Sequence, residues 1–174
     1  DDEKITDKEA VLCYPSQSLV ERTTLLHRLA FLFESDDDFL PPDAWVSLAK
    51  IAHHCCRQCP TIAMTDARFL KAMATKVLVP ASSWSAGETN KQGAVSWVLR
   101  AFAALASASR ANARKLINRF SVSSIARSFL AAECTEPGAR EHALRLWRSC
   151  ISYDDDLADL FNLSPVMASL REAA

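Results

Sequence analysis

Apolar residues recur every three or four positions along most of the chain, which is the spacing of one buried face of an α-helix. The clearest case follows Pro41-Pro42-Asp43. Proline is tolerated in the first turn of a helix, and an acidic residue suits the helix N-terminus. From there one apolar stripe runs until Pro60, which ends the helix; its members are Trp45, Leu48, Ile51, Ala52, Cys55 and Cys59. We therefore expect this stretch to be a core helix.

The same spacing predicts further helices along the chain, separated by short polar or proline-containing turns, and no strand. The longest predicted loop is 79–92, because it holds Pro80, several serines and Gly87. Of the other predicted helices, the first begins at a cap, Ser16 or Ser18, and runs to about Glu34. The next covers 66–77, with Thr65 as its cap. Further helices are predicted over 94–109, 111–120, 122–132 and 137–153, followed by a short helix that ends at Phe161 and a last helix from Pro165 onward.

Two parts of the chain resemble each other and predict a repeat. Residues 99–130 and 144–170 both begin Leu-Arg and continue with apolar residues at helical steps, and Leu116 and Phe161 fall at matching places. Armadillo and HEAT repeats have this order of a helix, a short helix and a helix, and they recur every 40 to 47 residues, roughly the spacing seen here. We therefore expect an all-α, armadillo/HEAT-like α-solenoid of about eight or nine helices. A generic helical bundle, which obeys the same packing rules, is the alternative.

Composition agrees with one helical domain. The chain has 174 residues, of which 49% are hydrophobic and only 3 are glycine, and its net charge is -1. So few glycines favour helices joined by short turns. We expect residues 1–16 to be a polar tail or linker and 17–174 to be a single domain. Because the chain starts at Asp1, we expect it to be part of a longer protein. No signal peptide or membrane span is evident, and we expect no membrane association.

Residues 53–60 read HHCCRQCP, a concentration of candidate metal ligands and thiols. His53, Cys56 and Cys59 could converge on one side of a helix, but a zinc site needs a fourth ligand, and no second Cys-x-x-Cys or histidine pair supplies it. Cysteines also act as small buried hydrophobes. We expect the end of a core helix, without metal or cofactor, and keep a metal or thiol protein as the less favoured alternative. With no catalytic motif elsewhere, we expect no enzyme.

Basic residues concentrate in one part of the chain. Seven lie between Lys91 and Ala132, and no acidic residue lies among them. Like charges at i, i+4 repel each other mildly, so a partner surface would account for them better than the fold does. The predicted partner-binding residues are Arg110, Arg114, Lys115, Arg119 and Arg127. An acidic protein surface is the expected partner; RNA is a less favoured one, since the overall charge is near zero.

In an armadillo-like solenoid the third helix of each unit lines the concave face. The predicted helix 122–132 would take that place here and present Ser124, Arg127 and Ser128. An ordinary solvated face, with its arginines paired to acids of neighbouring helices, is the alternative.

The segment AFAALASASRANARKL, with HALRLWRSCISY about forty residues further on, resembles the C-terminal region of the RNA polymerase II-associated protein 1 family. That family has an arginine-containing helix end followed by an Ala-Leu-x-Leu-Trp-Arg helix that finishes in Tyr-Gly. The resemblance covers residues 93–160. Asp154 stands where the family has glycine; the residues that match are Ala143, Leu144, Leu146, Trp147, Arg148 and Tyr153.

The resemblance implies a non-catalytic, armadillo-like scaffold. Its family is associated with transcription and with the assembly and nuclear delivery of RNA polymerase II, together with GPN-loop GTPases and chaperones. The partners implied are therefore polymerase subunits and assembly factors, and the location implied is the nucleus and cytoplasm. A generic armadillo-type adaptor for an acidic partner is the alternative that does not depend on the resemblance.

Overall fold

The computed structural model describes residue 20 and residues 24–81, 90–131 and 138–152. Within these ranges the chain is helical apart from short turns, and no strand is present, so the all-α prediction is confirmed. None of the described helices is both long and apolar enough to cross a membrane. The main α-helices are α2 (Leu25–Glu34), α3 (Pro42–Gln58), α4 (Pro60–Ala63), α5 (Ala67–Met73), α6 (Val79–Ala81), α7 (Val95–Ala108), α8 (Arg110–Phe120), α9 (Val122–Ala131) and α10 (Ala139–Ile151).

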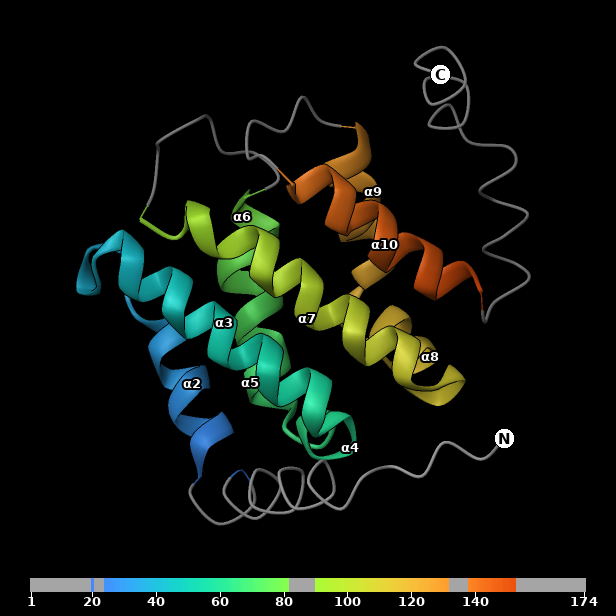
Figure 1. The fold of residues 1–174 in the computed structure, drawn as a ribbon, viewed down its shortest axis with the longest axis horizontal. Helices are drawn as coiled ribbons and strands as arrows, with labels where there is room; N and C mark the ends of the chain where they lie inside the picture. The colour runs from blue at the N-terminus through green and yellow to red at the C-terminus, as the bar shows by residue number, and fades with distance from the viewer. Residues whose placement is uncertain (1–19, 21–23, 82–89, 132–137, 153–174) are drawn as a thin grey trace, which may run out of the picture.

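Helix α7 is the centre of the fold. It packs against α3 on one side and α10 on the other, and the three helices run in the same direction as one layer (Figure 1). A second layer lies behind them, in which α8 packs against α7, α9 against α10, and α5 against α2. The core therefore lies between the layers, on the inner face of α7.

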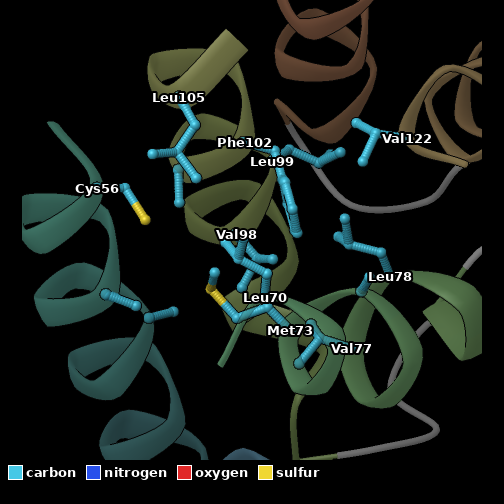
Figure 2. Packing of buried hydrophobic residues seen from close by; sticks show 14 of the residues in the cluster. Cys56, Leu70, Met73, Val77, Leu78, Val98, Leu99, Phe102, Leu105 and Val122 are labelled. Carbon is cyan, nitrogen blue, oxygen red and sulfur yellow. The ribbon is translucent and has the colours of Figure 1, made fainter. Parts of the chain in front are cut away.

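Side chains from both layers meet in this core, as Figure 2 shows. Phe102 of α7 is completely buried, and so is Cys56 of α3. Burying each large apolar side chain contributes roughly 1.5 to 3 kcal/mol. The other labelled residues of the cluster are Leu70, Met73, Val77, Leu78, Val98, Leu99, Leu105 and Val122.

Helix α3 begins and ends where the sequence predicts. Pro42 occupies its first turn, and Pro60 follows its end. Most of the predicted stripe is buried, but Ile51 is 46% exposed, so its assignment to the core was wrong. Cys56 is fully buried in its place. The buried face of α3 includes Cys56 because α7 packs against that side of the helix. The apolar spacing of α3 alone does not show which side α7 covers.

The predicted helix 66–77 and the loop after it differ from the structure. Asp66, not Thr65, caps α5, since its carboxylate accepts a 2.9 Å hydrogen bond from the backbone N–H of Phe69. The chain then forms a π-helical turn, Ala74–Leu78, and continues into α6. Proline is tolerated in the first turn of a helix, so Pro80 does not begin a loop. The rest of the predicted loop passes through 82–89, outside the described residues.

A buried lysine joins the start of α7 to the α2–α3 corner. Lys91 is only 3% exposed. Its Nζ lies 2.9 Å from the Asp37 carboxylate, donates to the Ser35 carbonyl at 2.8 Å, and lies 4.6 Å from the centre of the Trp45 ring. At the same junction a Cβ on Gly93 would stand 2.9 Å from a methyl carbon of Val46. A larger residue at position 93 would therefore force the Val46 side chain or the backbone to shift.

The helices α7, α8 and α9 follow their predicted ranges within one or two residues. Ser109 caps α8 by accepting a 3.1 Å hydrogen bond from the backbone N–H of Asn112, and Ser121 separates α8 from α9. Thr24 has a left-handed backbone with φ 50°, so α2 begins at Leu25. The predicted start near Ser16 or Ser18, and the predicted helices beyond 153, lie outside the described residues.

Candidate binding groove

The five predicted partner-binding residues lie in the second layer. Arg110, Arg114 and Arg119 are exposed on α8, and Arg127 is exposed on α9. Lys115 differs, because its Nζ donates a 2.8 Å hydrogen bond to the carbonyl of Met64, just after α4. Its ammonium group therefore holds α4 against α8. Among the other predicted surface positions, Ser124 and Ser128 of α9 are exposed as expected.

A groove of about 660 Å³ runs over the layer formed by α3, α7 and α10. We call it the cationic groove. Its cationic and ionisable residues come from all three helices: His53 and Arg57 from α3, Arg100 from α7, and His142 and Arg145 from α10. Its remaining lining residues are small, namely Ala103, Ala104, Ser107, Ala108 and Ser149.

Helical spacing explains why these side chains share one surface. His53 and Arg57 are four positions apart, and His142 and Arg145 are three apart, so each pair projects from one face of its helix. On α7, alanine and serine follow Arg100 at the same helical steps. Because these side chains are small, the surface of α7 forms the floor of the groove between the longer side chains of α3 and α10. Three parallel helices with these faces form a trough with basic edges.

The groove carries excess positive charge. Among the residues that the structure describes, no Asp or Glu lines it. Glu141 lies at its edge and forms a 2.6 Å ion pair with Arg145, but both side chains are more than half exposed. An exposed pair of this kind contributes little to stability, so Arg145 can exchange Glu141 for another carboxylate. Arg57 is exposed and has no ion pair among the described residues. Both guanidinium groups are therefore available to a partner.

Trp97 of α7 contacts cationic side chains of α3 and α7 beside the groove. The Arg100 guanidinium lies 4.6 Å from its ring centre, and the Lys50 ammonium lies 5.3 Å from it. The His53 ring lies 5.7 Å from the same ring. Contacts between cations and an aromatic face contribute about 0.5 to 1 kcal/mol each at exposed sites. The tryptophan therefore restrains Arg100, which lines the groove, and Lys50, which lies outside it.

The two groove histidines are held in the neutral form. Burial lowers the pKa of His142, and the nearby Arg100 charge lowers it further. Burial also lowers the pKa of His53, followed by the charges of His54 and Arg100. The Nδ1 atoms of His53 and His142 are buried and have no hydrogen-bond partner among the described residues. Desolvation and like charge both oppose a further proton in this groove.

The cysteine cluster lies in the core. Cys55, Cys56 and Cys59 are at most 6% exposed, which confirms that HHCCRQCP is the end of a core helix. Burial raises the pKa of the Cys55 thiol to about 11 and raises that of Cys56 well above its usual range. These thiols are therefore protonated at neutral pH and poorly nucleophilic. The described residues contain no group of three or more His, Cys, Asp or Glu side chains able to hold a metal ion.

The repeated segments of the sequence mark two of the groove arginines, which the run of basic residues did not single out. Arg100 and Arg145 are the arginines of the two Leu-Arg pairs that begin the repeated segments, and both line the groove. Arg57 directly follows Cys55 and Cys56, and no sequence pattern distinguishes it as a binding residue. Comparison with protein-family models, with curated proteins and with solved structures finds no match to this chain.

Proposed function

We propose that this chain is a non-catalytic helical-repeat scaffold, whose cationic groove binds an acidic segment of a partner protein. The observation that carries the proposal is the groove itself. Three arginines from three parallel helices line it, and none of the described residues that line it is acidic. Guanidinium groups bind carboxylates in paired hydrogen bonds, so arginines on three helices can hold several acidic side chains of one segment.

An armadillo/HEAT-like solenoid is the architecture that we propose for this scaffold. In such arrays the equivalent helices of successive units lie side by side and in parallel, as α3, α7 and α10 do (Figure 1). The repeated segments agree with this assignment. Arg100 and Arg145 occupy equivalent positions and line the same groove, and Phe102 and Trp147, which are equivalent two positions further on, are both buried. In this proposal α7 and α10, and not α9, are the helices of the binding face.

RNA polymerase II is the partner that we propose on the basis of the family resemblance. The resembling residues 93–160 include α7, α8, α9 and α10, and therefore two of the three groove helices. The role would be in polymerase assembly, nuclear import or transcription, with assembly factors such as GPN-loop GTPases as further partners, in nucleus and cytoplasm. A generic adaptor for an acidic partner is the alternative, and it needs only the groove.

The groove is tested with fluorescein-labelled deca-glutamate and fluorescence anisotropy. The variant Arg57→Glu/Arg145→Glu changes the groove, and Arg110→Glu/Arg114→Glu makes the same charge change on α8. We expect the groove variant to raise the Kd about tenfold or more, and the α8 variant to raise it by less than about threefold. Equal effects would contradict the groove as the binding surface. A labelled deca-uridylate that bound as tightly as deca-glutamate would favour an RNA backbone instead.

The polymerase proposal needs its own assay, because deca-glutamate does not identify a partner. Purified RNA polymerase II is passed over the immobilised chain and over the same two variants. We expect the parent and the α8 variant to retain the polymerase and the groove variant to lose it. If deca-glutamate binds and polymerase does not, the generic adaptor stands and the polymerase assignment falls.

A further inference from the structure

The second layer contains a cleft of its own, about 450 Å³ in volume. One wall is formed by the end of α5, the π-helical turn and α6, with Lys71, Thr75 and Val79. The other wall is formed by the end of α8 and by α9, with Arg119, Ser124 and Ile125. None of these residues belongs to the cationic groove. We call this hollow the rear cleft, because its walls belong to the second layer, away from the cationic groove.

Both walls of the rear cleft depart from regular helix. The π-helical turn Ala74–Leu78 forms one wall, and such turns occur frequently at functional sites. On the other wall Ser121 has a left-handed backbone with φ 51°, which is unfavourable for a residue with a Cβ atom. Irregular backbone of this kind concentrates at ligand-binding sites. These two irregular segments face one another across the rear cleft.

The chemistry of the walls restricts what that occupant can be. Val79 is 50% exposed at the edge and Ile125 lies deeper, at 9%, so the cleft offers an apolar surface. Lys71 and Arg119 are exposed on opposite walls, and no acidic residue is found in its lining within the described part of the chain. Glu34 shares an adjoining hollow with Lys71, but it is bonded to Arg68. A matching ligand therefore has both apolar and acidic side chains.

We propose that the rear cleft is a second docking site, which binds an amphipathic segment of a partner protein with acidic side chains flanking a large apolar one. The apolar side chain packs against Val79 and Ile125, and the carboxylates pair with Lys71 and Arg119. A highly acidic segment without apolar residues suits the cationic groove better, because that groove is lined by alanine, serine and charged groups. The protein then carries two separate binding surfaces and can bridge two segments.

The probe for this proposal is a labelled synthetic amphipathic peptide of about 14 residues, with leucines at helical spacing and Asp or Glu between them. A second peptide has Lys at the acidic positions. We expect the acidic peptide to bind, and the charge reversal Lys71→Glu/Arg119→Glu to weaken it about tenfold or more. The groove variant Arg57→Glu/Arg145→Glu should change its affinity by less than about threefold. Equal binding of the lysine peptide would overturn the proposal.

Methyl NMR places the peptide independently of charge. Titration should shift the methyl signals of Val79 and Ile125 and leave those of Ile51, which is exposed on α3, unchanged. A further variant, Ser124→Trp, fills the cleft without changing its charge and should also abolish binding. Retained binding in a folded Ser124→Trp protein, or unshifted Val79 and Ile125 signals, would overturn the proposal. Because deca-glutamate binding to the groove is measured separately, failure of the rear cleft does not bear on the proposed scaffold function.

Discussion

The guanidinium Nε of Arg100 donates a 2.7 Å hydrogen bond to Nε2 of His142, and this bond joins α7 to α10 across the cationic groove. Since Nε2 accepts, the proton of the neutral imidazole is assigned to Nδ1. His142 is only 4% exposed, and the bond to Arg100 is partly buried. Together with the contact of Arg100 on Trp97, it fixes the central cation of the groove before any partner arrives.

The stability of the fold should fall when the pH drops below about 6.5. The folded protein lowers the pKa values of His53 and His142, whereas the unfolded chain binds protons near the ordinary histidine value. The unfolded state therefore holds more protons below that pH, and the stabilisation present at higher pH is lost as the pH falls toward the lowered pKa values. Urea unfolding at pH 7.5 and pH 5.5 measures this difference.

The double variant His53→Gln/His142→Gln tests whether these two histidines cause the pH dependence of stability. Glutamine does not titrate in this range, so the variant should lose most of the difference in unfolding free energy between the two pH values. Should the double variant keep the parental pH dependence, other groups would be responsible for it.

Replacing Lys91 with methionine should destabilise the fold by about 2 to 4 kcal/mol. The substitution keeps most of the side-chain volume but removes the ammonium that bonds to Asp37 and Ser35 and lies over Trp45. Chemical denaturation followed by circular dichroism measures the loss. Lys50→Met is the matched control, because Lys50 is exposed and makes one cation–π contact, and its loss should remain below about 1 kcal/mol. Equal losses would mean that the buried amine contributes nothing special.

The Ser121→Gly variant should be more stable than the parent by roughly 0.3 to 1 kcal/mol. Glycine adopts the left-handed backbone of this position, φ 51°, without the steric cost that a Cβ atom imposes. Ser124→Gly is the control within α9, and it should be destabilising by about 0.5 kcal/mol, because glycine loses more backbone freedom in a helix than serine does. Thermal unfolding distinguishes the two signs. A loss of stability at both positions would remove the argument for strain at Ser121.

The thiols of Cys55, Cys56 and Cys59 should react slowly with iodoacetamide in the native protein at pH 7.5. They are buried, and the raised pKa values of Cys55 and Cys56 keep those two protonated. Peptide mapping by mass spectrometry, before and after denaturation in urea, gives the extent of labelling at each cysteine. Rapid labelling of any of the three in the folded protein would revive a thiol-based function for this segment.

Local sequence signals predicted the helices well. Pro42 and Pro60 bound α3 as expected, and Ser109 and Ser121 mark the ends of α8, since caps and breakers act within one turn. The π-helical turn was missed because its hydrogen-bond pattern leaves no distinct apolar period. In such places a neighbouring element, and not the local sequence, decides the backbone.

The sites were harder to predict because charge patterns do not reveal partners distant in sequence. Lys91 was counted with an exposed basic stretch, but Asp37 and Trp45 bury it. Lys115 bonds to the Met64 carbonyl in the same way. The cationic groove depends on three helices lying side by side. Its arginines became neighbours only once α3, α7 and α10 were placed in space.

The most direct test of the groove is a photo-crosslink to labelled deca-glutamate. The photoreactive amino acid p-benzoylphenylalanine is introduced at Ala104, which lines the groove on α7, and separately at Ala111, which is exposed on α8. We predict a crosslinked product from the Ala104 position that the Arg57→Glu/Arg145→Glu change removes, and little product from Ala111. Strong crosslinking from Ala111, with none from Ala104, would contradict the groove and return the binding surface to Arg110 and Arg114.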